Sequence, residues 1–255
     1  MSKSRDNGKS RNPQKHHFFG NLPLKIVALQ GFQFLIFIMD TPDTYRHKGL
    51  RKKLVAQLQS KGIADARVLE AINTVPRHLF MDSSFLEYAY QDKAFPIGSG
   101  QTISQPYTVA FQTELLEVGE NMKVLEVGTG SGYQASVLLA LGAKVYTLER
   151  QLHLYKRTKQ FFDRMRYPAR IFYKDGYEGL PAYAPYDRIL ITAAIPAIPD
   201  TLKQQLKVTG ILVAPVGKQG MQKMTRIIRH SDNDYEEQTF GGFVFVPMLP
   251  GKAED

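Results

Sequence analysis

Apolar and polar residues recur at two different periods along the chain. Between residues 50 and 75, apolar residues return every three or four positions, which predicts two amphipathic helices. Asp65 is a typical capping residue for the second helix, and Pro76 closes it. Residues 96–106, rich in glycine and hydroxyl side chains, predict a loop, and a helical period resumes after it.

From residue 123 onward, short apolar runs alternate with helical patterns. The predicted strands are KVLEV, KVYTLE, ARIFYKD, YDRILITAA and GILVAPVG, with helices at about 152–165 and 199–207. This order is typical of a parallel sheet covered on both faces. MTRIIRH and GGFVFVPML, separated by SDNDYEE, predict an antiparallel pair at one edge. We expect an α/β fold: a doubly wound, mostly parallel Rossmann-like sheet with N-terminal helices and an antiparallel C-terminal edge.

The first 38 residues follow neither period. A polar, basic stretch is followed by an apolar run at 26–39, which Gln30, Gly31 and Gln33 interrupt. The run is shorter than the ~18 uninterrupted apolar residues of a spanning helix, and no signal-peptide cleavage site follows it. A membrane-surface anchor and a simple appendage remain as alternatives, and we favour the appendage. We predict a disordered or weakly structured extension at 1–38 and one domain at 39–255, with parts at 39–122, 123–217 and 218–255.

The amino-acid composition excludes several kinds of active site and partner. The 255 residues include no cysteine, which excludes disulfides and thiolate chemistry and suits a reducing compartment; we expect the cytoplasm. The six histidines form no HExxH-type pattern, so we expect no metal. The net charge of +9 includes +5 from six basic residues and one acidic residue among the first 38. The rest is only mildly basic, and we expect no nucleic-acid partner and no stable membrane insertion.

A turn with three glycines follows the first predicted strand of the sheet. Gly128, Gly130 and Gly132 allow positive φ and close backbone approach, and the helix that follows offers unpaired N–H groups. Glu149 ends the next strand, at a spacing typical of a carboxylate that binds ribose hydroxyls. The pattern predicts a nucleoside ligand beyond the carboxyl ends of the strands.

The dinucleotide fingerprint is GxGxxG, and Tyr133 stands where its third glycine would be. The turn therefore favours an adenosine without a pyrophosphate, as in S-adenosylmethionine, over the dinucleotide of a dehydrogenase. Glu126, within the first strand, resembles the acidic position of S-adenosylmethionine binders. Asp175 and Gly176 follow the third strand, where a carboxylate meets the adenine amine. A simple Asp-Gly turn is the alternative there.

Four segments carry a family resemblance: AINTVPRHLF, AFPIGSGQTISQPYTVA, VLEVGTGSGYQAS and ILITAAIPAIPDTLKQQLKVTGILVAPVG. With the final FVFVPML they are spread along the chain, and the resemblance spans about residues 44 to 250. The chain resembles the protein-L-isoaspartate O-methyltransferases, and GQTISQP is the most specific match. The resemblance implies methyl transfer from S-adenosylmethionine to the free α-carboxylate of L-isoaspartyl residues in damaged proteins. The ester then collapses to a succinimide.

The resemblance also implies roles for individual residues. Ser104 matches the active-site serine, and Thr102 and Gln105 beside it are predicted to bind substrate. Apart from the resemblance, Val246 is, with Val244 and Phe245, a candidate wall of the peptide groove, and packing within the sheet is the alternative. The predicted cofactor site consists of Glu126, Gly128, Thr129, Gly130, Gly132, Tyr133, Glu149, Asp175 and Gly176. We expect isoaspartyl-containing proteins and peptides as partners, and a monomer.

The chemistry is consistent with these residues. The attacking carboxylate is already ionised, with a pKa of about 3.5, so no general base is needed. Ser104 is then a positioning hydroxyl that donates to the carboxylate oxygen that does not attack, while a loop serine bonded to backbone is the bland alternative. Rival functions are a methyltransferase for another acceptor and a non-catalytic cofactor-binding protein. TAAIPA lacks the Asn/Asp-Pro-Pro-aromatic motif of amine methylases, and an intact GQTIS loop argues against a binding protein.

Overall fold

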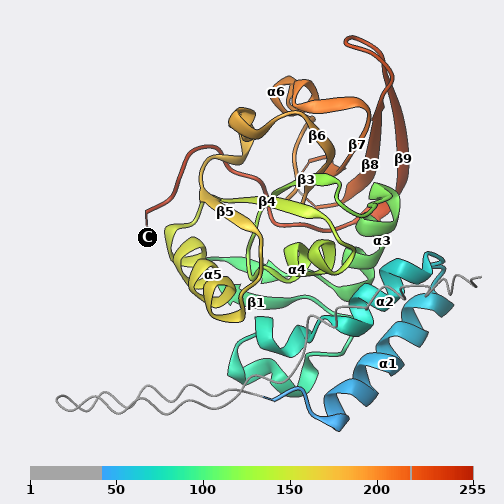
Figure 1. Cartoon of the computed structure of the whole chain (residues 1–255), viewed down its shortest axis with the longest axis vertical. Coiled ribbons are helices and arrows are strands. Elements are labelled where there is room, and N and C mark those ends of the chain that lie inside the picture. Colours follow the sequence, from blue (N-terminus) through green and yellow to red (C-terminus); the bar gives the residue numbers. More distant parts are fainter. Residues whose placement is uncertain (1–41, 219, 255) are drawn as a thin grey trace, which may run out of the picture. The chain divides into compact units, whose positions relative to one another are not determined.

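A mixed seven-stranded sheet forms the centre of the computed structural model, which describes residues 42–218 and 220–254; the predictions for 1–38 lie outside the described residues. The strand order is β5-β4-β3-β6-β7-β8-β9 (Figure 1). The first five strands in this order, β5, β4, β3, β6 and β7, are parallel. β8 pairs antiparallel with β7 and with β9, as predicted for this edge. The strands are β3 (Lys123–Val127), β4 (Lys144–Glu149), β5 (Arg170–Tyr173), β6 (Tyr186–Ile191), β7 (Leu206–Val216), β8 (Gln222–Arg229) and β9 (Tyr235–Phe243).

Helices precede the sheet and connect its strands. The α-helices are α1 (Tyr45–Ser60), α2 (Ala66–Thr74), α3 (Pro106–Leu116), α4 (Tyr133–Ala140), α5 (Leu152–Met165) and α6 (Asp200–Gln204). Short 3-10 helices are η1 (Arg77–Phe80), η2 (Ser83–Tyr88), η3 (Gly176–Glu178) and η4 (Pro181–Tyr183). The predicted cap is confirmed, since the Asp65 side chain accepts from the Arg67 N–H. Within the described ranges, no helix combines the length and apolar character that crossing a bilayer requires.

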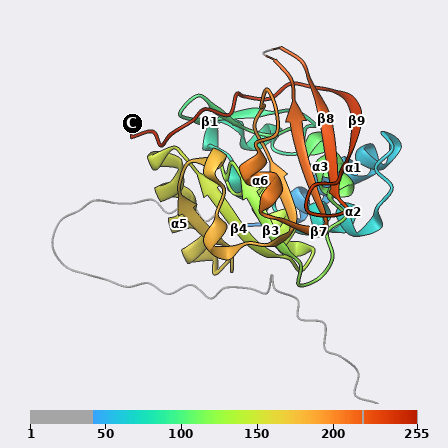
Figure 2. The ribbon, with the colours of Figure 1, turned by 90° about the horizontal axis from the view of Figure 1, so that it is seen from above.

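Two hydrophobic cores lie on opposite faces of the sheet, because successive strand residues point to opposite sides. On one face, Val124 and Val145 pack with the apolar residues of α1 to α5. On the other, Leu125 and Leu148 pack with α6, η4 and Met248. Figure 1 shows α6 above the sheet and α4 and α5 below it, and Figure 2 gives the view from above. Such double coverage is what near-continuous apolar strands require.

The prediction of a loop at residues 96–106 is wrong. The segment contains an antiparallel hairpin of β1 (Phe95–Gly98) and β2 (Gln101–Ile103), with the turn at 98–101. Its strands are too short, and too rich in proline and glycine, for an alternating pattern to show. Pairing places Ile103 in the core at 3% exposure and leaves Thr102 exposed. The hairpin thus fixes the chain immediately before Ser104.

The C-terminal strands also differ from the prediction. β9 begins at Tyr235, inside the predicted turn, and ends at Phe243, so the VFVPML part of the predicted strand lies outside it. Residues 246–253 leave the sheet edge and return across the ends of the parallel strands. Ala194 donates to the Val246 carbonyl and accepts from the Met248 N–H, both at 2.8 Å. Figures 1 and 2 both place the C-terminus beside α5, where the Leu152 N–H donates to the Ala253 carbonyl.

Candidate active site

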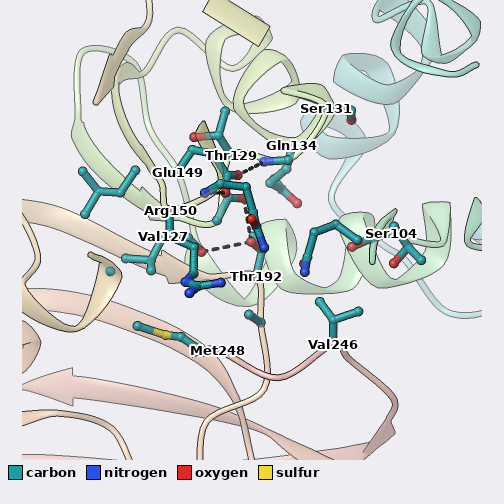
Figure 3. Close-up of a pocket in the computed structure, with 18 of the residues that line it drawn as sticks. Ser104, Val127, Thr129, Ser131, Gln134, Glu149, Arg150, Thr192, Val246 and Met248 are labelled. Atoms are coloured by element: carbon teal, nitrogen blue, oxygen red, sulfur yellow. Dashed lines mark hydrogen bonds between the residues drawn. The ribbon is translucent and has the colours of Figure 1, made fainter. Parts of the chain in front are cut away.

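One cleft lies at the carboxyl ends of the parallel strands, where ligands bind in such sheets. Its empty volume, including the part open to solvent, is about 860 Å³. The hairpin and residues 246–249 border it (Figure 3). The lining residues are Gln101, Thr102, Ile103, Ser104, Val109, Val127, Gly128, Thr129, Gly130, Ser131, Tyr133, Gln134, Leu148, Glu149, Arg150, Gln151, Lys174, Gly176, Thr192, Ala193, Val246, Pro247, Met248 and Leu249.

Most of the predicted site residues share this cleft, but four do not line it. The cleft brings the loop residues Thr102 and Ser104 together with Val246, the glycine turn, Glu149 and Gly176. The predicted residues outside its lining are Gln105, Glu126, Gly132 and Asp175.

The glycine turn needs its glycines for steric reasons. Gly128 has φ +103°, and an added side chain would collide with the Thr192 hydroxyl, which donates to the Val127 and Gly128 carbonyls at 2.9 and 2.8 Å. Gly132 has φ +86°, and a side chain there would strike the Phe162 ring. L-residues with side chains rarely adopt such φ values. The backbone can therefore approach a ligand closely and start α4 directly after the turn.

Glu149 holds the turn at the mouth of the cleft. Its carboxylate accepts from the Gly130 N–H and from the Gln151 N–H, each at 2.8 Å. The residue is 5% exposed, and this burial raises the pKa of its carboxyl, while the backbone donors counteract the rise. Each carboxylate oxygen can accept more than one hydrogen bond. The side chain can therefore also accept from hydroxyl groups of a ligand.

Glu126 lies beneath the turn. Its side chain is fully buried and accepts from the Thr147 hydroxyl at 2.6 Å, and Thr147 is 2.7 Å from the Thr129 hydroxyl. The other oxygen of Glu126 has no partner among the described residues. Burial raises the pKa of Glu126 to about 8, opposed by the bond from Thr147 and increased by the nearby charge of Glu149. Glu126 thus supports the turn from below.

Ser104 lies between the hairpin and α3, and it faces the cleft near Val246 (Figure 3). The alternative was an ordinary loop serine whose hydroxyl is bonded to the backbone. Within residues 42–218 and 220–254, the Ser104 hydroxyl makes no such bond. Gln105 points elsewhere, because its side chain donates to Asp92 at 3.1 Å. The polar side chains of this segment that line the cleft are those of Gln101, Thr102 and Ser104.

Asp175 fastens the C-terminal segment. One carboxylate oxygen accepts from the Tyr177 N–H at 2.9 Å, and the other accepts from the Gly251 N–H at 2.6 Å. Arg150 reinforces the contact, since its guanidinium donates to the carbonyls of Gly251 and Pro250. The segment that carries Met248 and Leu249 is thereby held against the cleft.

We expect Asp175→Ala to weaken cofactor binding about 10-fold. Loss of the carboxylate, which accepts from two backbone N–H groups, frees residues 246–253, and each bond to a charged group contributes about 1.5–3 kcal/mol. The dissociation constant, measured by titration calorimetry, checks this. Asp232→Ala is the control, because Asp232 is bonded to Arg229 and lies outside the cleft lining. An unchanged constant for Asp175→Ala would contradict the fastening role.

Sequence reasoning missed several residues of the cleft. Thr192 and Lys174 directly follow β6 and β5, so the rule that ligands bind beyond strand ends could have identified both. Gln134 gave no such signal. Its amide nitrogen donates to the Thr113 hydroxyl at 3.0 Å, and its oxygen is buried without a partner in the described part of the chain. Gln134 itself lines the cleft.

One group of side chains has the composition of a metal site. The ligand atoms of Asp43, His47 and His78 lie within 4.8 Å of one another, away from the cleft. However, Arg51 donates to both oxygens of Asp43, at 2.9 and 3.0 Å. A guanidinium in this position opposes a second cation, and we assign no metal to the group.

Comparisons with known proteins agree with this geometry. The family model described as protein-L-isoaspartate(D-aspartate) O-methyltransferase matches residues 49–253. The chain is 58% identical over 211 residues to the protein-L-isoaspartate O-methyltransferase of Christiangramia forsetii, covering 82% of this chain and 99% of that one. The corresponding Salinibacter ruber protein is 46% identical over 215 residues, with 80% and 93% covered.

Two solved structures have the same fold. One, named protein-L-isoaspartate O-methyltransferase, has a TM-score of 0.70 and 27% identity, over 77% of this chain and 65% of that one. Another, a Plasmodium falciparum protein in complex with S-adenosyl-L-homocysteine, has a TM-score of 0.69 at 22% identity, over 78% and 98%. The chain belongs to the protein-L-isoaspartate O-methyltransferase family.

Proposed function

We propose that the cleft holds S-adenosylmethionine against the glycine turn and the acceptor carboxylate against Ser104. The enzyme methylates the free α-carboxylate of L-isoaspartyl residues in damaged proteins, and the ester collapses to a succinimide. One observation carries the assignment of the site: the glycine turn and the Ser104 loop, distant in sequence, line a single cleft. That arrangement allows both reactants to be held at once.

The residues present fit the cofactor. Gly128 lines the cleft with backbone alone, and Glu149 keeps acceptor capacity suited to ribose hydroxyls. The partnerless oxygen of Gln134 suits the ammonium of the amino-acid part. When bound, S-adenosylmethionine supplies an electrophilic methyl group. The chain's own residues orient it and exclude water.

The acceptor needs placement more than activation. Its carboxylate is ionised at neutral pH, so the enzyme has only to hold one oxygen in line with the methyl group. We assign Ser104 as the donor to the other oxygen, because a donor to the attacking oxygen would reduce its nucleophilicity. Thr102 and Val246 border the same part of the cleft and are proposed substrate contacts.

We expect Ser104→Ala to lower kcat about 10- to 100-fold, because one hydrogen bond to a charged group contributes about 1.5–3 kcal/mol. Cofactor affinity should change less than about twofold, because Ser104 lies on the acceptor side. Steady-state kinetics with an isoaspartyl peptide, together with calorimetric titration of S-adenosylmethionine, separate the two effects. Equal losses in turnover and affinity would refute this assignment.

The acceptor is tested with two peptides that differ only in isoaspartate or aspartate at one position. Base-labile label transferred from S-adenosylmethionine to the isoaspartyl peptide alone is the expected result. We use the full chain and a version that begins at Met39, since we propose residues 39–255 as the catalytic domain; the family match at 49–253 supports this. We also propose a cytoplasmic monomer without a nucleic-acid partner, which sedimentation and fractionation can check.

A further inference from the structure

The Asp92 carboxylate gathers three donors from different parts of the chain. It accepts from the Lys61 ammonium at 2.6 Å, the Tyr107 N–H at 2.8 Å and the Gln105 amide at 3.1 Å. Only 4% of the Asp92 side chain is exposed, compared with 41% for Lys61. A carboxylate this buried and this fully bonded holds its partners in defined positions, because hydrogen bonds to charged groups are roughly twice as strong as neutral ones.

Helix α3 depends on this carboxylate for its start. Its N-cap residue is Gln105, whose side chain makes no capping bond. Pro106, the first helical residue, has no N–H to satisfy. The next N–H, of Tyr107, donates to Asp92, which is fifteen residues upstream. Asp92 therefore replaces the missing cap, and its negative charge is favourable at the helix N-terminus.

The same carboxylate ties α3 to the end of α1. Lys61 is the C-cap residue of α1, and its ammonium also lies 5.6 Å from the centre of the Tyr107 ring. The residue after Asp92 is held as well, since the buried Arg77 guanidinium donates to the Lys93 carbonyl at 3.2 Å. Asp92 is thus a fixed point from which the beginning of α3 is positioned.

Ser104 directly precedes this anchored segment. On its N-terminal side, Ile103 is buried and paired with Phe95 in the hairpin. On its C-terminal side, Gln105 and Tyr107 are bonded to Asp92. Because the chain is fixed on both sides, the hydroxyl of Ser104 has little freedom relative to the cleft.

We propose that Asp92 is a positioning residue for methyl transfer, which acts by fixing Ser104 relative to the glycine turn. The inference rests on the role proposed above for Ser104. Asp92 does not line the cleft. Its effect must therefore pass through the Gln101–Gln105 loop and should appear in turnover with the peptide, not in affinity for the cofactor.

The test is a double-mutant cycle of Asp92→Asn and Ser104→Ala. Asparagine keeps one acceptor for Tyr107 but presents its own N–H₂ group to the donors Lys61 or Gln105. Asp92→Asn alone should lower kcat for an isoaspartyl peptide about 10-fold, since displacements near 1 Å cost up to about 100-fold. In the Ser104→Ala background, it should lower kcat less than about twofold further.

Glu114→Gln is the matched control. Glu114 also carries a carboxylate that accepts two backbone N–H groups, of Ala64 and Asp65, but it joins α3 to the start of α2. Its kcat should stay within about twofold of the wild type. Calorimetric titration of S-adenosylmethionine, expected to be unchanged in Asp92→Asn, shows that the variant is folded.

The outcomes are distinct. The same loss from Asp92→Asn in both backgrounds, or no loss in either, overturns the positioning role of Asp92. A wild-type kcat for Ser104→Ala instead overturns the proposed role of Ser104. If Asp92→Asn does not fold, Lys61→Met repeats the cycle with one bond removed; a smaller loss that disappears in the Ser104→Ala background supports the inference, and an additive loss overturns it.

Discussion

Replacing Glu149 by glutamine should weaken S-adenosylmethionine binding about 100-fold. The carboxylate accepts from Gly130 and Gln151 and retains lone pairs for ribose hydroxyls. Glutamine has one acceptor oxygen, and its N–H₂ group would face a backbone donor. Bonds to a charged acceptor contribute about 1.5–3 kcal/mol each, and about 1.4 kcal/mol corresponds to tenfold in affinity. The loss of one hydrogen bond to the ribose and the disturbance of the glycine turn together account for the expected loss of affinity.

Calorimetric titration with S-adenosylmethionine measures this change. Asp163→Asn is the control, because Asp163 pairs with Lys159 on exposed helix surface and makes no part of the cleft. Its affinity should equal that of the wild type. Full affinity in Glu149→Gln would show that the ribose is bound elsewhere.

Replacing Glu126 by glutamine should change how stability depends on pH. The pKa of Glu126 is about 8 in the folded protein, against a usual 4.5, so the folded state holds a proton that the unfolded state releases. A raised pKa contributes stability below about pH 4.5 that is lost as pH rises to about 8. The wild type should therefore lose up to about 1.4 kcal/mol per pH unit relative to Glu126→Gln in this window.

Urea unfolding of both proteins at intervals between pH 5 and 9 measures the difference. Only the slope of the difference matters, because glutamine also changes the packing beneath the turn at every pH. The difference should level off above about pH 8. Parallel curves across the window would mean that Glu126 is ionised in the folded protein at neutral pH.

Much of the fold could be predicted because its signals are local. Asp65 and Gly132 mark where helices begin, and the apolar strands need only short windows to be recognised. The glycine turn and Glu149 were also predictable. Each is recognised next to its own strand, and the carboxyl ends of neighbouring parallel strands meet at one edge of the sheet.

Other parts depend on contacts between distant residues. Asp92 caps a helix that begins fourteen positions later, and no window around either segment reveals the bond. Glu126 matches a cofactor position in sequence, yet its side chain is buried beneath the glycine turn. It lies within β3, where successive side chains point to opposite faces of the sheet and are buried there. Val246 belongs to a segment that resembles a strand, but its partner is Ala194, in the connection after β6.

The position of residues 246–253 has a consequence for synthesis of the protein. The glycine turn and Glu149 leave the ribosome about a hundred residues before the segment that completes the wall of the cleft. During translation, the sheet can form while its cofactor cleft still lacks one side. Chains interrupted before residue 246 would lack this side of the cleft, so incomplete products should bind the cofactor less tightly than the finished enzyme.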